Sequence, residues 1–479
     1  MTNADLTLIL PFIVIVATSL ILMLMISFYR CHILAAFLTL GGIALSLFSL
    51  TLSYPLLPRQ VTSLLILDHY VVFYSGLILA ASFLITALSY GYLQKQGGDR
   101  EEFYLLLLLA ILGSTVLVAS NHFASLFLGL EILSVSLYAL IAYLRTNERG
   151  FEAGIKYLVL AATSAAVLLF GMALIYGELG TMSLSDIASR MASPGSPNIF
   201  LLAGTAMIIV GLGFKLAVVP FHMWTPDVYE GSPAPVTAFI ASVSKGALFA
   251  LLVRYFTLID IRAHGPLFLI FTLIAIASMF AGNLLALLQN NVKRILAYSS
   301  IAHLGYLLVA FLATNAYAAK TVAFYLITYF VSIIGAFGII AVLSDKQREP
   351  DKIDDYTGMA SRRPLLSGVF TAVLLSLAGI PVTAGFIGKF YIIKAGSGSA
   401  LWLLVIVLVI NSTIGLFYYL RIILAIYKPV EKEYSLLASR ISLSGGIVLA
   451  VLLILLIWLG VYPSLFIDVI QTMIGGKFT

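Results

Sequence analysis

Three lysines and one glutamate lie in apolar stretches of the chain, where a charged side chain is costly. They are Lys215 in IIVGLGFKLAVVP, Lys245 in FIASVSKGALFALL, Lys389 in LAGIPVTAGFIGKFYII and Glu131 in SLFLGLEILSVSLYAL. An ionisable side chain held in hydrocarbon costs several kcal/mol and marks a functional position by default. We therefore expect these residues to carry a small ion, most simply a proton, across a membrane.

A buried lysine and a carboxylate form a workable proton-carrying pair. Removal from water lowers the pKa of a lysine by up to several units, and a nearby carboxylate raises it again. At about 4 Å and an effective dielectric of about 20, an opposite charge contributes ~4 kcal/mol, or about three pKa units. Protonating Glu131, or moving it away from a buried lysine, would therefore make that lysine release its proton.

Each of these residues also has a structural interpretation. Glu131 lies about 14 Å deep, and it is either a polar residue paired with a neighbouring helix or a titrating carboxylate. A lysine near a helix end normally extends to the headgroups, which is easier for Lys215 than for Lys245. In the last of the four stretches, Lys394 is better placed for this than Lys389. Several charges at similar depth favour the proton path over the structural alternative.

Two histidines and a fourth lysine are candidates for supporting roles. Histidine ordinarily titrates near neutral pH, so His303 in SSIAHLGYL and His222 in PFHMW are either proton relays or satisfied interior residues. Lys156 in FEAGIKYLVL lies just inside its apolar run and either interacts with Glu131 or extends to the interface.

The composition places these residues in a membrane protein. Of 479 residues, 61% are hydrophobic and 10% are charged, whereas soluble domains have about 25% charged residues. The basic residues are scattered at the ends of apolar runs, which is typical of interface anchors and not of a nucleic-acid site. Cys31 is the only cysteine, so we expect neither an intramolecular disulfide nor a cysteine metal cluster. No basic segment precedes the first apolar run, so we expect that run to be a retained helix.

Apolar runs of about 20 residues predict an all-α polytopic membrane protein with about fourteen transmembrane helices. The expected segments are 7–28, 31–53, 70–90, 103–120, 122–144, 153–177, 199–219, 233–256, 265–288, 294–313, 320–343, 366–393, 401–427 and 442–465. The connections are too short for a soluble domain, so residues 1–479 are expected to form a single transmembrane domain.

Two of the expected helices contain helix-breaking residues beside a lysine. The seventh is followed by Pro220, Pro226, Pro233 and Pro235, and the twelfth contains Gly379, Pro381, Gly385 and Gly388. Broken helices at membrane depth occur only where protein or water lines them. Breaks five helices apart predict two inverted five-helix repeats, helices 4–8 and 9–13, with a transport site at the breaks. The divisions would be 1–100, 101–262, 263–430 and 431–479.

The distribution of basic residues predicts the orientation. Connections after odd-numbered helices carry Arg30, Lys95, Arg100, Arg145, Arg149, Lys293, Arg294, Lys346, Arg348, Lys352, Arg362, Arg363, Lys428, Lys432 and Arg440. The opposite side carries at most Arg59, Arg190, Arg254, Arg262, Lys320, Lys394 and Lys477. The first side is therefore expected to be cytoplasmic, with both termini outside, in the periplasm of a Gram-negative bacterium.

Four stretches of the chain resemble subunit N of bacterial respiratory complex I, the proton-translocating NADH–quinone oxidoreductase. They are LFLGLEILSVSLYALIAYL, GLGFKLAVVPFHMWTPDVYEGSPAPVTAFIASVSKGALFALLVR, NNVKRILAYSSIAHLGYLLVA and LLSLAGIPVTAGFIGKFYIIKA, and the resemblance runs from about Asp68 to Pro463. The related subunits L and M typically read VKxPxxPxHxWLPxAH and LLKxG. This chain reads FKLAVVPFHMWTPDVYEG and VSKGA there, which is the N-type form.

The resemblance implies fourteen helices, two inverted repeats and roles for the charged residues. Glu131 matches the fifth-helix glutamate and Lys215 the seventh-helix lysine, a pair whose coupling controls proton release. Lys245 matches a bridging lysine, Lys389 an exit lysine, and His303 lies on the polar axis between them. Lys156 and His222 match polar positions of the N-type subunit. The long C-terminal arm of subunit L is not expected here.

The resemblance also implies that electrons pass from NADH through FMN and iron–sulfur clusters to a quinone in other subunits. This chain contains no P-loop, dinucleotide motif or CxxC pair, so we expect it to bind no cofactor or metal itself. Its expected partners are subunit M, the small membrane subunits A, J and K and the lipid of the inner membrane, but not nucleic acid. Two alternatives are a subunit of a multisubunit cation/proton antiporter and a membrane arm of a hydrogenase-type complex.

Overall fold

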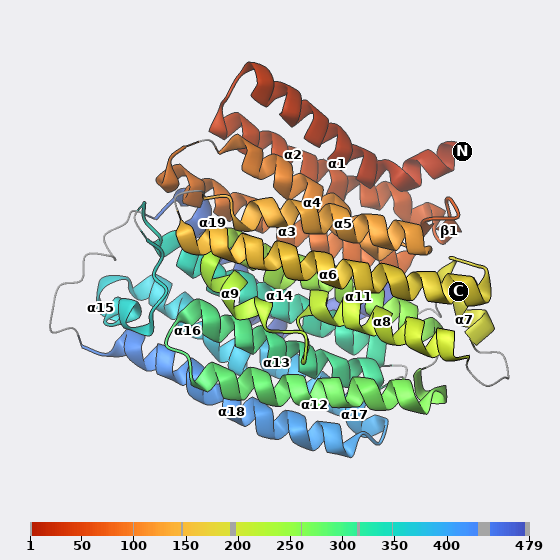
Figure 1. Ribbon diagram of the computed structural model, residues 1–479. Helices are drawn as coiled ribbons and strands as arrows, with labels where there is room; N and C mark the ends of the chain where they lie inside the picture. Colours follow the sequence, from red (N-terminus) through yellow and green to blue (C-terminus); the bar gives the residue numbers. More distant parts are fainter. Residues whose placement is uncertain are drawn as a thin grey trace. The chain divides into compact units, whose positions relative to one another are not determined.

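The computed structural model describes residues 2–98, 100–144, 147–191, 198–259, 261–313, 317–346, 348–429 and 441–474. Nearly all of these residues are helical (Figure 1). Thirteen of the helices are long and apolar enough to cross a membrane. The prediction of an all-α polytopic membrane protein is therefore confirmed.

The chain forms two compact units, each assembled from three segments of sequence. Unit 1 consists of Met1–Phe83, Glu101–Trp224 and Val243–Phe268. Unit 2 consists of Leu84–Arg100, Thr225–Ser242 and Leu269–Thr479. The predicted division at residues 100, 262 and 430, and the inversion of the two repeats, stay predictions.

Unit 1 contains most of the N-terminal helices. Its helices are α1 (Asn3–Phe28), α2 (His32–Ser53), the first half of α3 (His69–Gln96), α4 (Glu101–Ala119), α5 (Phe123–Ile141), α6 (Glu148–Leu179), α7 (Leu184–Met191), α8 (Ile199–Leu216) and α11 (Lys245–Ile259). A short hairpin, β1 (Arg59–Gln60) and β2 (Ile66–Leu67), precedes α3. Helix α6 packs along α8, and a Cβ on Gly171 of α6 would lie 2.7 Å from the carbonyl oxygen of Gly204. Small residues of this kind let helix backbones approach closely.

Unit 2 is arranged around α14. Its helices are the second half of α3, most of α9 (Trp224–Gly231), α10 (Ala234–Phe239), most of α12 (Gly265–Leu287), α13 (Val292–Leu312), α14 (Ala318–Leu343), α15 (Met359–Arg362), α16 (Pro364–Ala378), α17 (Ala384–Gly398), α18 (Trp402–Tyr427), α19 (Leu443–Val461) and α20 (Ser464–Ile474). Helix α14 contacts α10, α13, α16, α17 and α19. Its central position buries almost every side chain that it carries.

Side-chain caps begin many of these helices. Asn147, Asn198 and Asn291 each accept a hydrogen bond from a backbone N–H in the first turn of α6, α8 and α13. Ser442 does the same for α19. A cap of this type satisfies one of the free donors at a helix N-terminus and contributes about 1 kcal/mol. The sequence therefore marks the start of these helices independently of their apolar runs.

Both predicted breaks are present, and both contain strained backbone. Helix α8 ends at Leu216, and Ala217 follows with φ 62°. The predicted segment 366–393 is two separate helices, α16 and α17, with Gly379 at φ 83° and Val382 at φ 72° between them. A positive φ is costly for a residue with a Cβ, above all for a β-branched one, and such strain gathers at functional sites.

Some elements were not expected from the sequence. The predicted helix 233–256 contains a π-helical turn at Ile240–Ser244, which separates α10 from α11. The connection predicted over Gly177–Asn198 contains α7, and α20 follows the last predicted helix. The basic residues Arg145, Lys432, Arg440 and Lys477, used in the orientation argument, lie outside the described residues.

A buried cluster of polar side chains fixes the N-terminus of α10 within unit 2. One Glu349 carboxylate oxygen accepts from the backbone N–H of Ala234 at 2.9 Å and from the Tyr92 hydroxyl at 2.6 Å. The other accepts from Lys293 Nζ at 2.6 Å. An anionic group at a helix N-terminus is stabilised by the free N–H groups and the helix dipole. The connection around Glu349 thus determines where α10, and hence the π turn, begins.

Candidate functional site

Lys215 is held at the end of α8 by a hydroxyl of α5. The side chain is 4% exposed, and Nζ donates to Ser134 Oγ at 2.6 Å. Ser134 in turn donates to the carbonyl oxygen of Leu130 at 2.6 Å, so a lone pair of its hydroxyl faces the ammonium group. A hydrogen bond that involves a charged donor is about twice as strong as a neutral one.

Glu131 lies one helical turn before Ser134 on α5. The residue is half-buried, and its Oε1 atom is buried without a hydrogen-bond partner among the described residues. Its charge is within electrostatic range of Lys215, Tyr138 and Tyr157. Residues three or four apart share a helix face, so α5 presents Glu131, Ser134 and Tyr138 together. Glu131 therefore interacts with Lys215 through its charge, while the hydrogen bond of the Lys215 ammonium goes to Ser134.

An aromatic ring lies beside the Lys215 ammonium, and further aromatic rings pack against that ring. It lies 5.9 Å from the ring centroid of Tyr157 on α6. The Tyr157 ring packs against Trp224 at 4.8 Å and Tyr138 at 5.5 Å, and the indole N–H of Trp224 donates to the carbonyl oxygen of Phe214 at 2.9 Å. A cation beside an aromatic face is stabilised without another charge, so the Tyr157 ring contributes to holding the Lys215 ammonium.

Lys245 is the first residue of α11 and follows the π turn directly. The side chain is 1% exposed in unit 1, which excludes extension to the surface. A π turn inside an α-helix is uncommon and is frequent at functional sites. Lys245 is therefore buried, as the sequence predicts, and the π turn determines its position on the helix.

The two supporting candidates of unit 1 differ in their surroundings. His222 is buried just after the end of α8; both ring nitrogens lack a well-formed hydrogen bond within the described chain, and the Pro220 carbonyl is an acceptor in poor geometry. Lys156 is exposed, and its Nζ pairs with Glu152 at 2.7 Å on the same helix. The exposure of Lys156 is what we expect of a lysine that extends to the interface. The burial of His222 is what we expect of an interior histidine.

Lys389 lies in the second turn of α17, and its ammonium group reaches the end of α16 across the break in unit 2. Its ammonium group donates to the carbonyl oxygens of Leu377 at 3.1 Å and Ala378 at 2.7 Å, and to Ser412 Oγ at 2.9 Å. The two carbonyls belong to the C-terminus of α16, where the helix dipole favours a cation. A Cβ at Gly379 would lie 2.8 Å from the Lys389 side chain, so glycine makes room for it. Lys394 is exposed on the same helix, as expected of the residue that extends outward.

His303 lies near Lys389 in unit 2, within electrostatic range of its charge. The imidazole is buried, with Nδ1 2.7 Å from the Tyr325 hydroxyl and Nε2 3.3 Å from the Tyr419 hydroxyl. The Lys389 ammonium is 5.2 Å from the ring centroid of Tyr306. Glu131, Lys215, Lys245 and His222 belong to unit 1, and His303 and Lys389 to unit 2. Of these residues, Glu131 lies within electrostatic range of Lys215, and His303 within that of Lys389.

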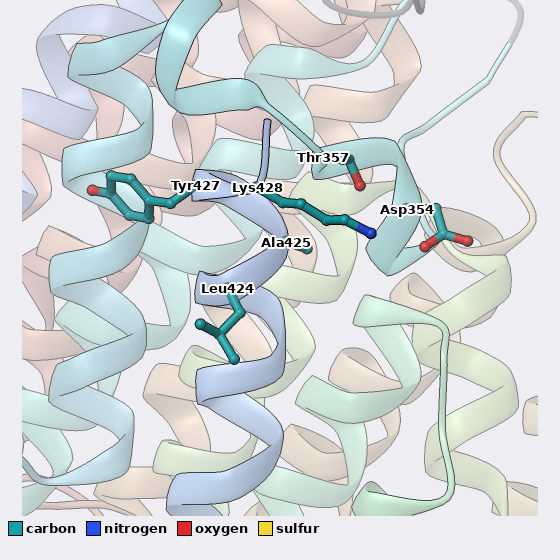
Figure 2. A pocket seen from close by; sticks show the side chains of 6 residues that line it. All are labelled: Asp354, Thr357, Leu424, Ala425, Tyr427 and Lys428. Atoms are coloured by element: carbon teal, nitrogen blue, oxygen red, sulfur yellow. The ribbon is translucent and has the colours of Figure 1, made fainter. Parts of the chain in front are cut away.

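No group of three or more His, Cys, Asp or Glu side chains within the described ranges is arranged to hold a metal ion. A hollow of about 500 Å³ lies on unit 2 between the end of α18 and the connection before α15 (Figure 2). Its lining residues are Asp354, Thr357, Leu424, Ala425, Tyr427 and Lys428. None of the buried ionisable residues described above lines this hollow.

The sequence and the fold both match known membrane subunits. Residues 120–415 match the family described as NADH:quinone oxidoreductase/Mrp antiporter, TM. NADH-quinone oxidoreductase subunit N of Nitrosospira multiformis is 51% identical, with 99% of this chain and 97% of that protein covered. The chain belongs to the subunit N family of NADH-quinone oxidoreductases.

Two solved structures share the fold of this subunit N family member. A chain of respiratory complex I from Thermus thermophilus with bound aureothin is 33% identical, has a TM-score of 0.82 and is matched over 96% of this chain and 98% of that one. A chain of the Mrp complex from Dietzia sp. DQ12-45-1b is 20% identical, has a TM-score of 0.85 and is matched over 99% and 97%. The second likeness concerns the fold alone.

The hydroxyl groups that hydrogen-bond to the ionisable residues of this subunit were not predicted from the sequence. Ser134 is three residues after Glu131, and this spacing was a usable signal because it places both on one helix face. Tyr325, Tyr419 and Ser412 carry no such signal. Tyr325 and Ser412 lie on the helices that directly follow those of His303 and Lys389, and Tyr419 is far from His303 in sequence, so only the packing of unit 2 shows which hydroxyls meet these residues.

Proposed function

We propose that this chain is a proton-translocating membrane subunit of an NADH–quinone oxidoreductase, and that Glu131, Lys215, Lys245, His303 and Lys389 carry the protons. The observation that supports this most directly is that a buried lysine accompanies each helix break: Lys215 at the end of α8, and Lys389 in α17, whose ammonium group bonds to the end of α16. Interrupted helices in paired positions are the preferred location of transport sites in membrane proteins.

Proton release in unit 1 would follow from the competition of Glu131 and Ser134 for Lys215. An ionised carboxylate brought to about 4 Å would stabilise the ammonium form by ~4 kcal/mol at an effective dielectric of about 20. The hydroxyl accepts the same hydrogen bond without this charge. A change in the charge or position of Glu131 therefore decides whether Lys215 keeps its proton, and no cofactor in this chain is needed for that step.

In this proposal, FMN, the iron–sulfur clusters and the quinone are bound by other subunits, and their redox reactions drive the proton steps. The neighbours would be subunit M and the small subunits A, J and K. The chain would lie in the bacterial inner membrane with both termini in the periplasm. The likeness to subunit N of other bacteria and to a complex I chain supports this arrangement. Lys156 and His222 would have supporting roles.

The decisive experiment measures proton uptake driven by NADH in inverted membrane vesicles that contain the assembled complex. We expect Lys215→Ala, Glu131→Ala and Lys389→Ala each to reduce uptake at least tenfold, because each removes a group that no neighbour replaces. Lys394→Ala is the control: it also removes a lysine from α17, but an exposed one, and it should pump within about twofold of the unmodified complex. Normal pumping by assembled Lys215→Ala or Glu131→Ala complex would refute the assigned roles.

A further inference from the structure

Four buried side chains form a continuous hydrogen-bonded line in unit 2. Ser299 and His303 come from α13, Tyr325 from α14 and Tyr419 from α18. The Ser299 and Tyr419 hydroxyls are hydrogen-bonded to each other. Tyr419 then contacts His303 Nε2 at 3.3 Å, and His303 Nδ1 contacts Tyr325 at 2.7 Å. The imidazole therefore has a phenol hydroxyl on each of its nitrogens.

This arrangement uses both functions of a neutral imidazole. One ring nitrogen donates a proton and the other accepts one, while a phenol hydroxyl does both. Of the two tyrosines, one must therefore donate to His303 and the other must accept from it. The line has a direction, and reversing that direction moves one proton along it.

We propose that Tyr325 and Tyr419 are proton-relay residues that deliver protons to His303 and remove them from it. This inference rests on the proposed function, since it presupposes that His303 lies on the proton path. When a proton passes from Tyr419 to Nε2, the proton on Nδ1 passes to the Tyr325 oxygen. Tyr419 regains a proton from the Ser299 hydroxyl, which takes one from a water molecule, and Tyr325 passes its own hydroxyl proton to a second water molecule, so neither phenol nor the serine retains a charge after the transfer. The transfer in the opposite direction uses the same bonds.

The packing of α17 connects this line to Lys389. Tyr325 lies against Gly388, where a Cβ would be 2.9 Å from the tyrosine ring. The residue next to Gly388 is Lys389, whose charge is within electrostatic range of His303. Because glycine at 388 lets α17 approach this closely, one end of the line lies beside the helix that carries the buried lysine.

Other buried tyrosines of unit 2 do not bond to His303 and show that the arrangement is selective. The Tyr329 ring is 5.2 Å from the imidazole, closer than the Tyr325 ring at 6.0 Å, yet its hydroxyl donates to Ser300 at 2.8 Å. The Tyr306 ring is 5.5 Å away, and its hydroxyl accepts from Asn283. Tyr329 is thus a matched control for Tyr325, one turn further along α14.

The test replaces single hydroxyls in the assembled complex. Tyr325→Phe and Tyr419→Phe keep the buried ring and remove only the oxygen. Each should slow NADH-driven proton uptake at least tenfold, because a positioned acid or base typically contributes about 10²–10⁴-fold to the rate of a proton transfer. Tyr329→Phe should pump within about twofold of the unmodified complex. The solvent deuterium isotope effect on uptake should rise in both relay variants and not in Tyr329→Phe, a change that loosened packing would not produce.

His303→Gln separates this inference from the proposed function, because glutamine keeps hydrogen-bonding capacity but does not relay protons as imidazole does. If His303→Gln is impaired while Tyr325→Phe and Tyr419→Phe both pump like Tyr329→Phe, the tyrosine relay is refuted and the function stands. If assembled His303→Gln pumps normally, the role of His303 fails and the relay fails with it. If only one of the two tyrosine variants assembles, normal pumping by that variant refutes the relay, because the line is broken wherever one hydroxyl is removed.

Discussion

The lysines at the two helix breaks are held in different ways. Lys215 in unit 1 donates to one hydroxyl, Ser134, and has a carboxylate, Glu131, within electrostatic range. Lys389 in unit 2 donates to two backbone carbonyls and a hydroxyl. A carboxylate can change its charge, whereas a carbonyl cannot. Under the proposed function, the direct surroundings of Lys215 therefore include a group that can change its charge, whereas the groups that accept from Lys389 keep theirs.

The variant with the largest expected effect changes the backbone packing at the second break and should lower the stability of the fold. In unit 2, a Cβ on Gly385 would lie 1.8 Å from the carbonyl oxygen of Ser376, so Gly385→Ala should destabilise the fold by more than about 4 kcal/mol. In unit 1, a Cβ on Gly213 would meet the edge of the Phe221 ring at 3.0 Å, so Gly213→Ala should be tolerated. The amount of assembled complex on a native gel measures both.

Gly368→Ala, on the neighbouring helix α16, is the control for this pair, because a Cβ there meets no atom within 4 Å. It should leave assembly unchanged. If Gly385→Ala assembles as well as Gly368→Ala, the close contact of α17 with the end of α16, which places the Lys389 ammonium on fixed carbonyls, is wrong.

An intermediate effect concerns the hydroxyls that hold the lysines. Ser134→Ala removes the hydrogen-bond acceptor that Lys215 has within the described chain, and a hydrogen bond to a charged group contributes about 1.5–3 kcal/mol. Proton uptake should fall about tenfold or more. Ser412→Ala leaves Lys389 with its two carbonyls, and uptake should change less than about threefold.

Ser136→Ala provides the matched control on α5. Its hydroxyl donates to the carbonyl oxygen of Ile132 and it is buried like Ser134. Uptake should stay near the unmodified rate. Equal losses in the Ser134 and Ser412 variants would show that the two lysines depend on their hydroxyls alike, against the comparison.

The smallest effect concerns the strained residues in the breaks. Val382 is exposed at φ 72°, so Val382→Gly removes steric strain and little packing. It should stabilise by ~1 kcal/mol, because a left-handed conformation costs a residue with a Cβ about 1–2 kcal/mol. Ala217 at φ 62° is fully buried, and Ala217→Gly should give almost no gain because the lost methyl contacts offset the relief. The temperature at which the solubilised complex loses half of its activity measures both; a larger gain at Ala217 would contradict this account.

Much of the fold follows from local features of the sequence. Apolar length located the spans, and prolines and glycines beside Lys215 and Lys389 located the breaks. The helix-cap residues would have sharpened several boundaries. The π turn before Lys245 was missed, because IASVS contains no proline or glycine and reads as ordinary helix.

The candidate site was predictable only in its charges. Buried lysines and Glu131 stand out because charge is rare in apolar runs. What holds them does not stand out: the acceptors of Lys389 are backbone carbonyls freed by the end of α16, and every residue has a carbonyl. Tyr419 is more than a hundred residues from His303, and a tyrosine in an apolar helix is unremarkable until the packing places its hydroxyl on an imidazole nitrogen.

The π turn at Ile240–Ser244 has a consequence for which side of its helix carries Lys245. Each residue of an α-helix turns the chain by about 100°, and a π turn fits one extra residue into a turn. Everything after Ser244 is therefore rotated by about 100° from the face it would occupy in an uninterrupted helix that began at the same prolines. The helix face on which Lys245 lies is thus determined by the five uncharged residues of the π turn.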